Sequence, residues 1–424
     1  MQQAQSQSSS SGPRHQGQSS SDGSKHGSTT SIREYLINAK THLQTQLRRD
    51  DRQGRVNLVI GNESADLDSI TCALVYGYTQ SASRADDLLI PITNIPASDL
   101  ALRPELTALL KYANASPSDL ITLDDLGGIP LPLASTNVWL VDHNALQGTL
   151  GKHYSDAVCG VIDHHDDEGK VASDVHPRII EKSGSCSSLV TNYCHDAWES
   201  MPSGRSSGNM AGASAQVAKL ALGSILIDTY NLESGDKVKD HDRKAVDYLE
   251  AKIQASGDDY DRDTFFEKIN SAKSDIDGLS LPDILRKDYK QWSEGVLTLG
   301  ISSVVKPVDY LRDKAAKADS DFIKTLVDFA KARKLHLYAV MAAYTAESGS
   351  FARQLLLLSL EDGKPTAALH RFTRSSSDEL QLQTADLQTF SGTERVPFCG
   401  FYDQKNITAS RKQVGPMLRQ AMGE

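Results

Sequence analysis

The chain has 424 residues, of which 39% are hydrophobic and 24% charged, and its formal net charge is -10. This composition is ordinary for a globular protein, and at roughly 150 residues per domain the length predicts two domains plus a tail. The negative charge argues against a general nucleic-acid binder, because such proteins carry a basic footprint. An anionic substrate would therefore have to be attracted by metal ions or by a local basic patch.

No apolar run approaches the roughly 20 residues that a membrane-spanning helix requires, and the start of the chain lacks the regions of a secretory signal. We therefore expect a cytoplasmic protein that binds no membrane. The cysteines are odd in number and never spaced as a CxxC pair, which predicts reduced thiols rather than disulfides or a zinc-thiolate site. They are Cys72, Cys159, Cys186, Cys194 and Cys399.

Residues 1–30 are mostly Ser, Gln, Gly and His. With almost no large apolar side chain, this segment cannot bury enough surface to offset the entropy lost on ordering, so we predict that it is disordered. The alternative is a mitochondrial transit peptide, since the segment is rich in Ser and poor in acids, although it lacks repeated Arg on an amphipathic helix. That alternative would place a minor pool of the protein in mitochondria.

The apolar pattern of the first half predicts an α/β domain. Residues 31–47 have helical spacing and predict a first docked helix. Three later apolar runs each end in Asn, Asp or His, and runs of this kind are typical of buried strands in a parallel sheet. They span residues 56–62, 137–144 and 157–165, with helices expected between them at 69–82 and 101–113. In a parallel sheet their polar ends meet at one edge, where open α/β folds bind ligands.

After about residue 235 the sequence changes from mainly apolar runs to charged amphipathic segments. A Ser/Gly/Met-rich stretch at 199–214 predicts an exposed loop, and the apolar run 215–232 predicts a buried helix that carries Asp228 inward. Charged amphipathic helices are expected next, at 240–253 and 283–292, followed by strands at 295–305, 334–345 and 352–360. This order predicts a second, α+β domain. We therefore divide the chain into a tail (1–30), a first domain (31–235) and a second domain (236–424).

Acids and histidines gather at the expected strand ends. Asp66 and Asp68 follow the first strand, Asp142 ends the second, and His164 and His165 end the third. An Asp-x-Asp pair alone is as typical of a solvated turn or a helix cap, but three strand ends with the same chemistry predict a binding site. Carboxylates with an imidazole favour Mg²⁺ or Mn²⁺ over structural zinc. Two such ions could share one carboxylate and activate a water between them.

Six motifs in this order resemble those of a known family. "GNESADLDSI" (61–70), "LVDHN" (140–144), "VIDHH" (161–165) and "GSILIDT" (223–229) are similar to the DHH phosphoesterase superfamily. "ILRKDYKQW" (284–292) and "ASRKQVGP" (409–416) resemble the DHHA2 domain of eukaryotic exopolyphosphatases, prune-like proteins and family II inorganic pyrophosphatases. The resemblance runs from about residue 31 to the last residue. It implies an N-terminal DHH domain with a mainly parallel sheet, a smaller DHHA2 domain, and an active site in the cleft between them.

The resemblance also implies roles for individual residues. It makes Asp66 a ligand of a first metal, Asp142 a bridging carboxylate, and His165 a phosphate-facing histidine. Asp68, His164 and Asp228 become ligands of a second metal. Lys290, Arg411 and Lys412 become the cations that grip terminal phosphates, a task suited to the planar fork of Arg and the mobile charge of Lys.

One position departs from the pyrophosphatase pattern. Where those enzymes have a histidine ligand before the paired aspartates, this chain has Asn62. An amide oxygen is a harder ligand than imidazole, if it binds at all, so Asn62 predicts a weaker first site and a preference for Mg²⁺ over Mn²⁺.

The closest similarity in motifs is to fungal cytosolic exopolyphosphatase, which implies a monomeric enzyme that acts on inorganic polyphosphate with two divalent ions. A family II-like pyrophosphatase, a prune-like phosphodiesterase and a signalling scaffold with a residual metal site remain alternatives. Some basic residues could instead be ordinary surface charges, and Ser185–Ser188 could either contact phosphate or cap a helix. The further candidates for a basic substrate path are Lys287, Lys306, Arg371 and Arg374.

Overall fold

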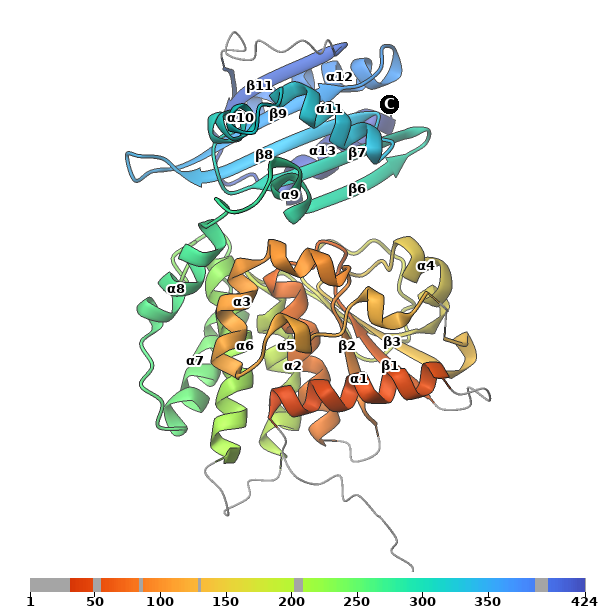
Figure 1. Cartoon of the computed structure of the whole chain (residues 1–424), viewed down its shortest axis with the longest axis vertical. Coiled ribbons are helices and arrows are strands. Elements are labelled where there is room, and N and C mark those ends of the chain that lie inside the picture. The colour runs from red at the N-terminus through yellow and green to blue at the C-terminus, as the bar shows by residue number, and fades with distance from the viewer. Residues whose placement is uncertain are drawn as a thin grey trace, which may run out of the picture.

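The computed structural model describes residues 31–48, 55–83, 87–128, 131–201, 209–385 and 396–423, and the side chains of residues 209–211 are not described. The tail predicted for residues 1–30 lies outside these ranges. Two bodies follow one another along the chain, the first carrying α1–α8 and the second carrying β6–β11 (Figure 1). Among the described residues, no helix is both long enough and apolar enough to cross a bilayer.

The first body is built on a five-stranded sheet in the order β2-β1-β3-β4-β5, and all of its strands are parallel. Its strands are β1 (Val56–Ile60), β2 (Leu89–Ile92), β3 (Thr136–Val141), β4 (Val158–Asp163) and β5 (Arg178–Ile180). Every residue of β1 and β2 is buried, as expected for strands covered on both faces. The three predicted strands and the parallel arrangement are therefore confirmed.

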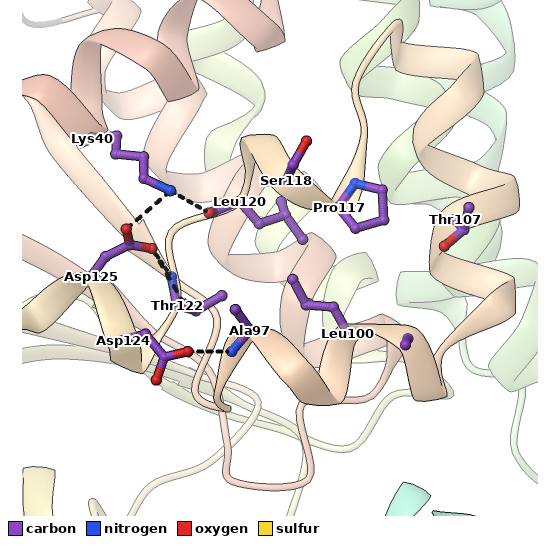
Figure 2. A pocket seen from close by; sticks show the side chains of 11 residues that line it. Lys40, Ala97, Leu100, Thr107, Pro117, Ser118, Leu120, Thr122, Asp124 and Asp125 are labelled. Carbon is purple, nitrogen blue, oxygen red and sulfur yellow. Dashed lines mark hydrogen bonds and ion pairs between the residues drawn. The ribbon is translucent and has the colours of Figure 1, made fainter. Parts of the chain in front are cut away.

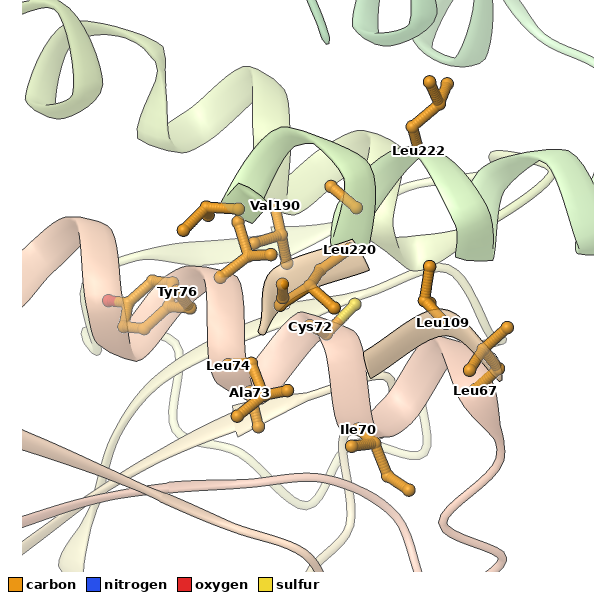
Figure 3. Close-up of a cluster of buried hydrophobic side chains, with 14 of the residues drawn as sticks. Leu67, Ile70, Cys72, Ala73, Leu74, Tyr76, Leu109, Val190, Leu220 and Leu222 are labelled. Atoms are coloured by element: carbon orange, nitrogen blue, oxygen red, sulfur yellow. The ribbon is translucent and has the colours of Figure 1, made fainter. Parts of the chain in front are cut away.

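Helices cover both faces of this sheet. The long ones are α1 (Ile32–Arg48), α2 (Leu67–Ser83), α5 (Cys186–Glu199), α6 (Asn209–Thr229), α7 (Asp240–Ala255) and α8 (Arg262–Ser274), and the short ones are α3 (Pro104–Leu110) and α4 (Gly148–Tyr154). The central helix is α2, which is buried continuously from Leu67 to Gln80. Its side chains meet Leu109 of α3, Val190 of α5 and Leu220 of α6 (Figure 3). This packing fixes the start of α2, where Asp66 and Asp68 lie.

Two boundaries differ from the sequence-based expectations. The predicted loop 199–214 is partly helical, because α6 begins at Asn209. The domain boundary expected at 235 lies further along the chain, because α7 and α8 bury Leu249, Phe265 and Ile269 in the core of the first body. The second core begins at Ile276. Charged amphipathic helices such as α7 look alike in sequence whichever core receives their apolar side.

The second body is a six-stranded mixed sheet in the order β10-β11-β9-β8-β7-β6, in which only β7 and β8 pair in parallel. Its strands are β6 (Tyr289–Glu294), β7 (Leu297–Val304), β8 (Leu337–Thr345), β9 (Phe351–Ser359), β10 (Leu382–Thr384) and β11 (Phe398–Gln404). Its helices are α9 (Leu281–Lys287), α10 (Val308–Lys317), α11 (Phe322–Ala332), α12 (Lys364–Leu380) and α13 (Arg411–Gly423). The helix predicted over 283–292 is thus wrong beyond Lys287, where β6 pairs with β7.

Away from the strand ends, the first body contains a cavity of about 490 Å³ beside α1 (Figure 2). Lys40 lies at its wall, with its ammonium 3.0 Å from a carboxylate oxygen of Asp125 and 3.4 Å from the carbonyl oxygen of Leu120. The lining includes none of the residues predicted to bind metal or phosphate. This cavity is therefore separate from the predicted site at the carboxyl edge of the sheet.

Candidate metal centre at the junction of the two domains

The loop after β1 is held tightly against the start of α2. Gly61 is required there, since a Cβ at this position would lie 2.3 Å from the hydroxyl oxygen of Ser69. That hydroxyl accepts a hydrogen bond from the Asn62 backbone (2.6 Å), and a carboxylate oxygen of Asp66 accepts one from the Ser69 backbone (3.0 Å). Asp66 therefore caps the first turn of α2 and is fixed at the carboxyl edge of the sheet.

The Asn62 side chain faces the site with its amino group. Its Oδ1 accepts hydrogen bonds from the backbone of Ser64 and of Ala65 and from the Ser64 hydroxyl, so Oδ1 is identified by donors of known type. Its Nδ2 donates to a carboxylate oxygen of Asp142 (2.7 Å). In this orientation Asn62 offers no ligand atom to a cation, contrary to the expectation for the first metal. It instead donates to the carboxylate expected to bridge the metals.

The substitution Asn62→His is therefore expected to shift metal preference towards Mn²⁺. It removes a donor from Asp142 and places an imidazole nitrogen beside it, and imidazole is a softer ligand than carboxylate or water. We expect the ratio of Mn²⁺- to Mg²⁺-supported activity to rise about tenfold, within the range that metal-site neighbours contribute. Activity titrations with each metal measure this ratio, with Asn114→His as a control for an added surface histidine. An unchanged ratio would contradict it.

Asp142 lies directly after β3 with a left-handed backbone (φ 62°), a conformation that Asp tolerates better than most residues. The turn sends its side chain into the site, where the residue is 2% exposed. Its Oδ1 has no hydrogen-bond partner among the described residues. Burial raises the pKa of Asp142 well above its usual value, and the charges of Asp68 and Asp66 raise it further. A buried carboxylate with an unpaired oxygen is a fitting ligand for a cation.

His164 and His165 leave the end of β4 with fixed and different orientations. The Nδ1 of His164 lies 3.2 Å from the carbonyl oxygen of Ser183, which fixes the tautomer and leaves Nε2 as an acceptor, 3.3 Å from Oδ1 of Asp142. The Nδ1 of His165 is held by Asp163 at 2.7 Å. Burial lowers the pKa of His165 to about 4 in spite of that bond. Ligand atoms of Asp142, His164 and His165 all lie within 4.8 Å of one another.

Asp68 joins this cluster from the first turn of α2, with Oδ2 3.9 Å from Nε2 of His164. Its carboxylate also accepts hydrogen bonds from the backbone of Cys186 and Ser187 and from the Ser185 hydroxyl, at the start of α5. Burial by itself would raise the pKa of Asp68, but the imidazole of His164 and these bonds lower it to about 2. Ser185 stands at the N-cap position of α5 but makes no capping hydrogen bond with its side chain, because its hydroxyl donates to Asp68.

Asp228 and Asp66 are the remaining predicted ligands, and the structure relates them to the site through the effect of their charges. Burial raises the pKa of Asp228 well above its usual value, and the charges of Asp68 and Asp66 add to this. Its Oδ2 has no partner among the described residues. Two buried carboxylate oxygens without hydrogen-bond partners, together with the imidazole of His164, are the donor types that suit a divalent cation such as Mg²⁺ or Mn²⁺.

The second domain brings cations to the same place. The Lys412 ammonium, in the first turn of α13, donates to Nε2 of His164 at 2.9 Å. Arg411 is paired with Asp288 at 2.7 Å. On β6, burial and the charge of Arg411 lower the pKa of Lys290, while the charge of Asp142 opposes this. Lys412 and Lys290 thus act on groups of the first domain, whereas the partner of Arg411 is Asp288 of its own domain.

The other basic candidates have structural partners. Lys287 is paired with Glu105 (2.7 Å), the Arg371 guanidinium donates to the carbonyl oxygen of Ala421 (2.8 Å), and the Lys306 ammonium lies 5.6 Å from the centre of the Tyr310 ring. Arg374 is exposed on α12. These contacts give no support to a substrate path through these residues.

Three residues important to the site's geometry were missed by the sequence-based reasoning: Asp163, Asp242 and Arg103. Asp163 was read as part of a motif without a role, although it orients His165. Asp242 and Arg103 lie in stretches that read as ordinary helices. No spacing rule would have found Asp242 and Arg103, because they act on loops distant in sequence.

Two family models match the chain: "DHH family, N-terminal domain" over residues 57–225 and "DHHA2 domain" over residues 267–421. The chain is 32% identical over 387 residues to "Putative exopolyphosphatase" of Schizosaccharomyces pombe, covering 91% of this chain and 94% of that protein. It is 28% identical over 394 residues to "Exopolyphosphatase PRUNE1" of Mus musculus, covering 92% and 79%.

A more distant relative is "Manganese-dependent inorganic pyrophosphatase" of Methanothrix thermoacetophila, 24% identical over 250 residues, which covers 58% of this chain and 68% of that protein. Among solved structures, "Methanococcus jannaschii putative family II inorganic pyrophosphatase" matches the fold with a TM-score of 0.55 and 19% identity, covering 86% of this chain and 99% of that chain. The chain therefore belongs to the DHH family, in the group whose members continue into a DHHA2 domain.

Proposed function

We propose that the protein is a metal-dependent exopolyphosphatase, which removes terminal orthophosphate from linear inorganic polyphosphate. The observation that carries this proposal is the meeting of two kinds of group. His164 of the first domain lies within hydrogen-bond reach of a cation of the second, with the Lys412 ammonium 2.9 Å from its Nε2. The charges of Lys290 and Asp142 also act on one another across the junction. A site that is acidic on one side and basic on the other suits metal ions and a polyanion together. The similarity to two proteins named as exopolyphosphatases supports the choice of substrate.

The metal ligands in this proposal are Asp66, Asp68, Asp142, His164 and Asp228. Divalent ions held there would lower the pKa of a water between them and neutralise charge on phosphate oxygens. Asn62 holds the carboxylate of Asp142 in place through its amide NH2 group. Ser183 and Asp163 hold the two histidine rings.

The chain's own residues then bind and orient the substrate. Lys290, Arg411 and Lys412 attract the terminal phosphate and hold it against the first domain. His165, whose Nδ1 is held by Asp163, would donate from Nε2 to a phosphate oxygen in its protonated form, which the negative charge of a bound phosphate favours. Water adds across the terminal P–O–P bond, orthophosphate leaves, and the polyphosphate becomes one unit shorter. Because the residues involved come from both domains, closure of the two around the substrate would exclude bulk water.

Two enzymatic alternatives and one of another class remain to be separated. Pyrophosphatase activity is favoured by the similarity to the manganese-dependent relative, but Asn62 stands where a histidine ligand is expected in that family. A prune-like phosphodiesterase would act on nucleotides. A signalling scaffold would keep the metal site without turnover. We further propose that the protein is a cytoplasmic monomer that prefers Mg²⁺.

The test is orthophosphate release by metal-stripped protein after Mg²⁺ or Mn²⁺ is restored. Long polyphosphate, tripolyphosphate, pyrophosphate and a cyclic nucleotide are compared in parallel. Release from the long chain with pyrophosphate left intact supports the proposal. Cleavage of pyrophosphate alone moves the protein to the pyrophosphatases, hydrolysis of the cyclic nucleotide alone makes it a phosphodiesterase, and no reaction with any substrate favours the scaffold.

The substitution Lys412→Met is expected to lower kcat/KM for polyphosphate about 100-fold, the usual effect of removing one positioned donor from a charged transition state. Metal affinity should be unchanged or higher, since the substitution removes a positive charge beside His164. Steady-state kinetics and metal titration measure the two effects separately. Lys405→Met, which removes a lysine paired with Asp403 on the same domain, is the control. Weaker metal binding with normal kcat/KM would contradict the role given to Lys412.

A further inference from the structure

Arg103 lies at the junction of the two domains and is 3% exposed. It separates the short helix η1 (Ala97–Leu102) from α3. Its guanidinium donates to the carbonyl oxygens of Ser64 and Ala65, in the loop that carries Asp66. Because Ala65 has a left-handed backbone (φ 42°), a conformation unfavourable for alanine, external hydrogen bonds are needed to hold this loop.

The same guanidinium reaches the second domain. Its Nη2 also donates to the carbonyl oxygen of Lys287 at 3.1 Å. The next residue is Asp288, whose carboxylate pairs with Arg411 at 2.7 Å and whose carbonyl oxygen accepts from Nη1 of Arg411 at 3.2 Å. A continuous path thus runs from the Asp66 loop through Arg103 to Arg411.

Two ion pairs flank this path and cross the same junction. Lys287 pairs with Glu105 at 2.7 Å, with side chains that are 11% and 6% exposed, and Arg286 pairs with Asp99. These pairs hold the main chain at Lys287 next to Arg103. The guanidinium itself is bonded to main-chain carbonyls, including that of Asp99 (3.1 Å), so its task is to fix backbone positions.

We propose that Arg103 is a positioning residue that sets the metal-binding loop of the first domain in register with the phosphate-gripping Arg411 of the second. The substrate in this inference is taken from the proposed function, whereas the contacts of Arg103 do not depend on it. Only arginine offers five donors in a planar fork, and lysine at this position could not serve carbonyl groups on three separate segments. The consequence is that substrate affinity depends on a residue that touches neither substrate nor metal.

The test compares Arg103→Lys, which keeps the charge, with Asp288→Asn and the double variant. Arg371→Lys is the matched control, since Arg371 also donates to a main-chain carbonyl, that of Ala421, but within one domain. kcat and KM for polyphosphate are measured at saturating Mg²⁺, and Mn²⁺ affinity is measured by electron paramagnetic resonance. Thermal melting verifies folding, and Arg103→Gln replaces Arg103→Lys if the latter does not fold.

We expect Arg103→Lys to raise KM about tenfold, as loss of groups that orient a site typically does, and to lower kcat less than about threefold. Asp288→Asn should also raise KM. The double variant should then show about the KM of the more affected single variant, because the effects of substitutions on one connected path do not add. Arg371→Lys should leave KM unchanged. A wild-type KM in Arg103→Lys, or KM effects that simply multiply, would overturn the inference.

Failure of the proposed function would show separately. If wild-type protein releases no orthophosphate from polyphosphate, the substrate is wrong, and the Mn²⁺ titration still tests Arg103. In that case Arg103→Lys is expected to weaken Mn²⁺ binding about tenfold through the displaced Asp66 loop, while Arg371→Lys does not. Equal Mn²⁺ affinity in wild type, Arg103→Lys and Arg371→Lys would then overturn it.

Discussion

The substitution Asp142→Asn is expected to reduce orthophosphate release from polyphosphate about 10³-fold. This is the upper end of the effect of removing one preorganised charge-stabilising group. Asp142 is buried, lies between Asn62 and His164, and keeps one oxygen free of hydrogen bonds. Asparagine suits the left-handed backbone at this position, so the fold should be retained. Steady-state assays measure the loss, and Asp167→Asn, at an exposed acid paired with Arg178, is the control.

The same variant is expected to change stability in opposite directions with and without metal. Without metal, burial and the neighbouring charges raise the pKa of Asp142, so its ionised form is unfavourable in the folded state and a neutral amide should raise the melting temperature. With Mg²⁺, wild type gains about 2.7 kcal/mol at 100 times Kd, and the variant should gain much less. Thermal melting with and without Mg²⁺ measures both effects. Equal stabilisation of the two proteins by Mg²⁺ would exclude Asp142 as a ligand.

The substitution Asp242→Ala is expected to lower the free energy of unfolding by about 3 to 5 kcal/mol, because several buried donors each lose an acceptor at a cost of about 1 to 3 kcal/mol. Asp242 is 0% exposed and accepts hydrogen bonds from the backbone of Gly184 (2.8 Å) and Lys239 (2.7 Å) and from the Ser188 hydroxyl (2.6 Å). Alanine leaves these donors without a partner in the interior. Urea unfolding measures the loss, and Asp240→Ala, at an exposed acid in the same helical turn, should cost far less.

Asp242 should also matter to the metal centre, because the loop that it holds supports two predicted ligands. Ser183 fixes the ring of His164, and Ser185 donates to Asp68. We expect the conservative substitution Asp242→Asn to weaken metal binding about 10- to 100-fold, the usual effect of losing a group behind the ligands. Metal titration of the folded variant measures this. Wild-type metal affinity in Asp242→Asn would limit Asp242 to a role in stability.

The metal side of the site could be largely anticipated from the sequence. Asp142 and His164 end apolar runs, and parallel strands place their carboxyl ends at one edge, so the two had to lie near each other. The roles of individual ligands still rest on resemblance. The orientation of Asn62 was not accessible, because an amide can present either end, and only the donors of Ser64 and Ala65 decide which end faces Asp142.

The error at β6 has a physical cause. The stretch around Lys290 is rich in charged residues and follows a true helix, so local spacing favours helix over strand. Backbone hydrogen bonds with β7 decide otherwise, and residues of β7 lie several positions further along the chain. The domain boundary expected near residue 235 differs from the structure for a related reason. Nothing in the sequence of a helix such as α8 indicates which core buries Phe265.

The sequence by itself determined the parallel sheet, its buried helices and the family, because local periodicity and ordered motifs are properties of the chain alone. Only the tertiary structure decided which groups hold the site together. Arg103 joins Ala65 to Lys287, and Asp242 holds Gly184, across separations that no local pattern encodes. Hydrogen bonds between distant segments depend on how both domains pack, and for that reason the supporting residues emerged only from the fold.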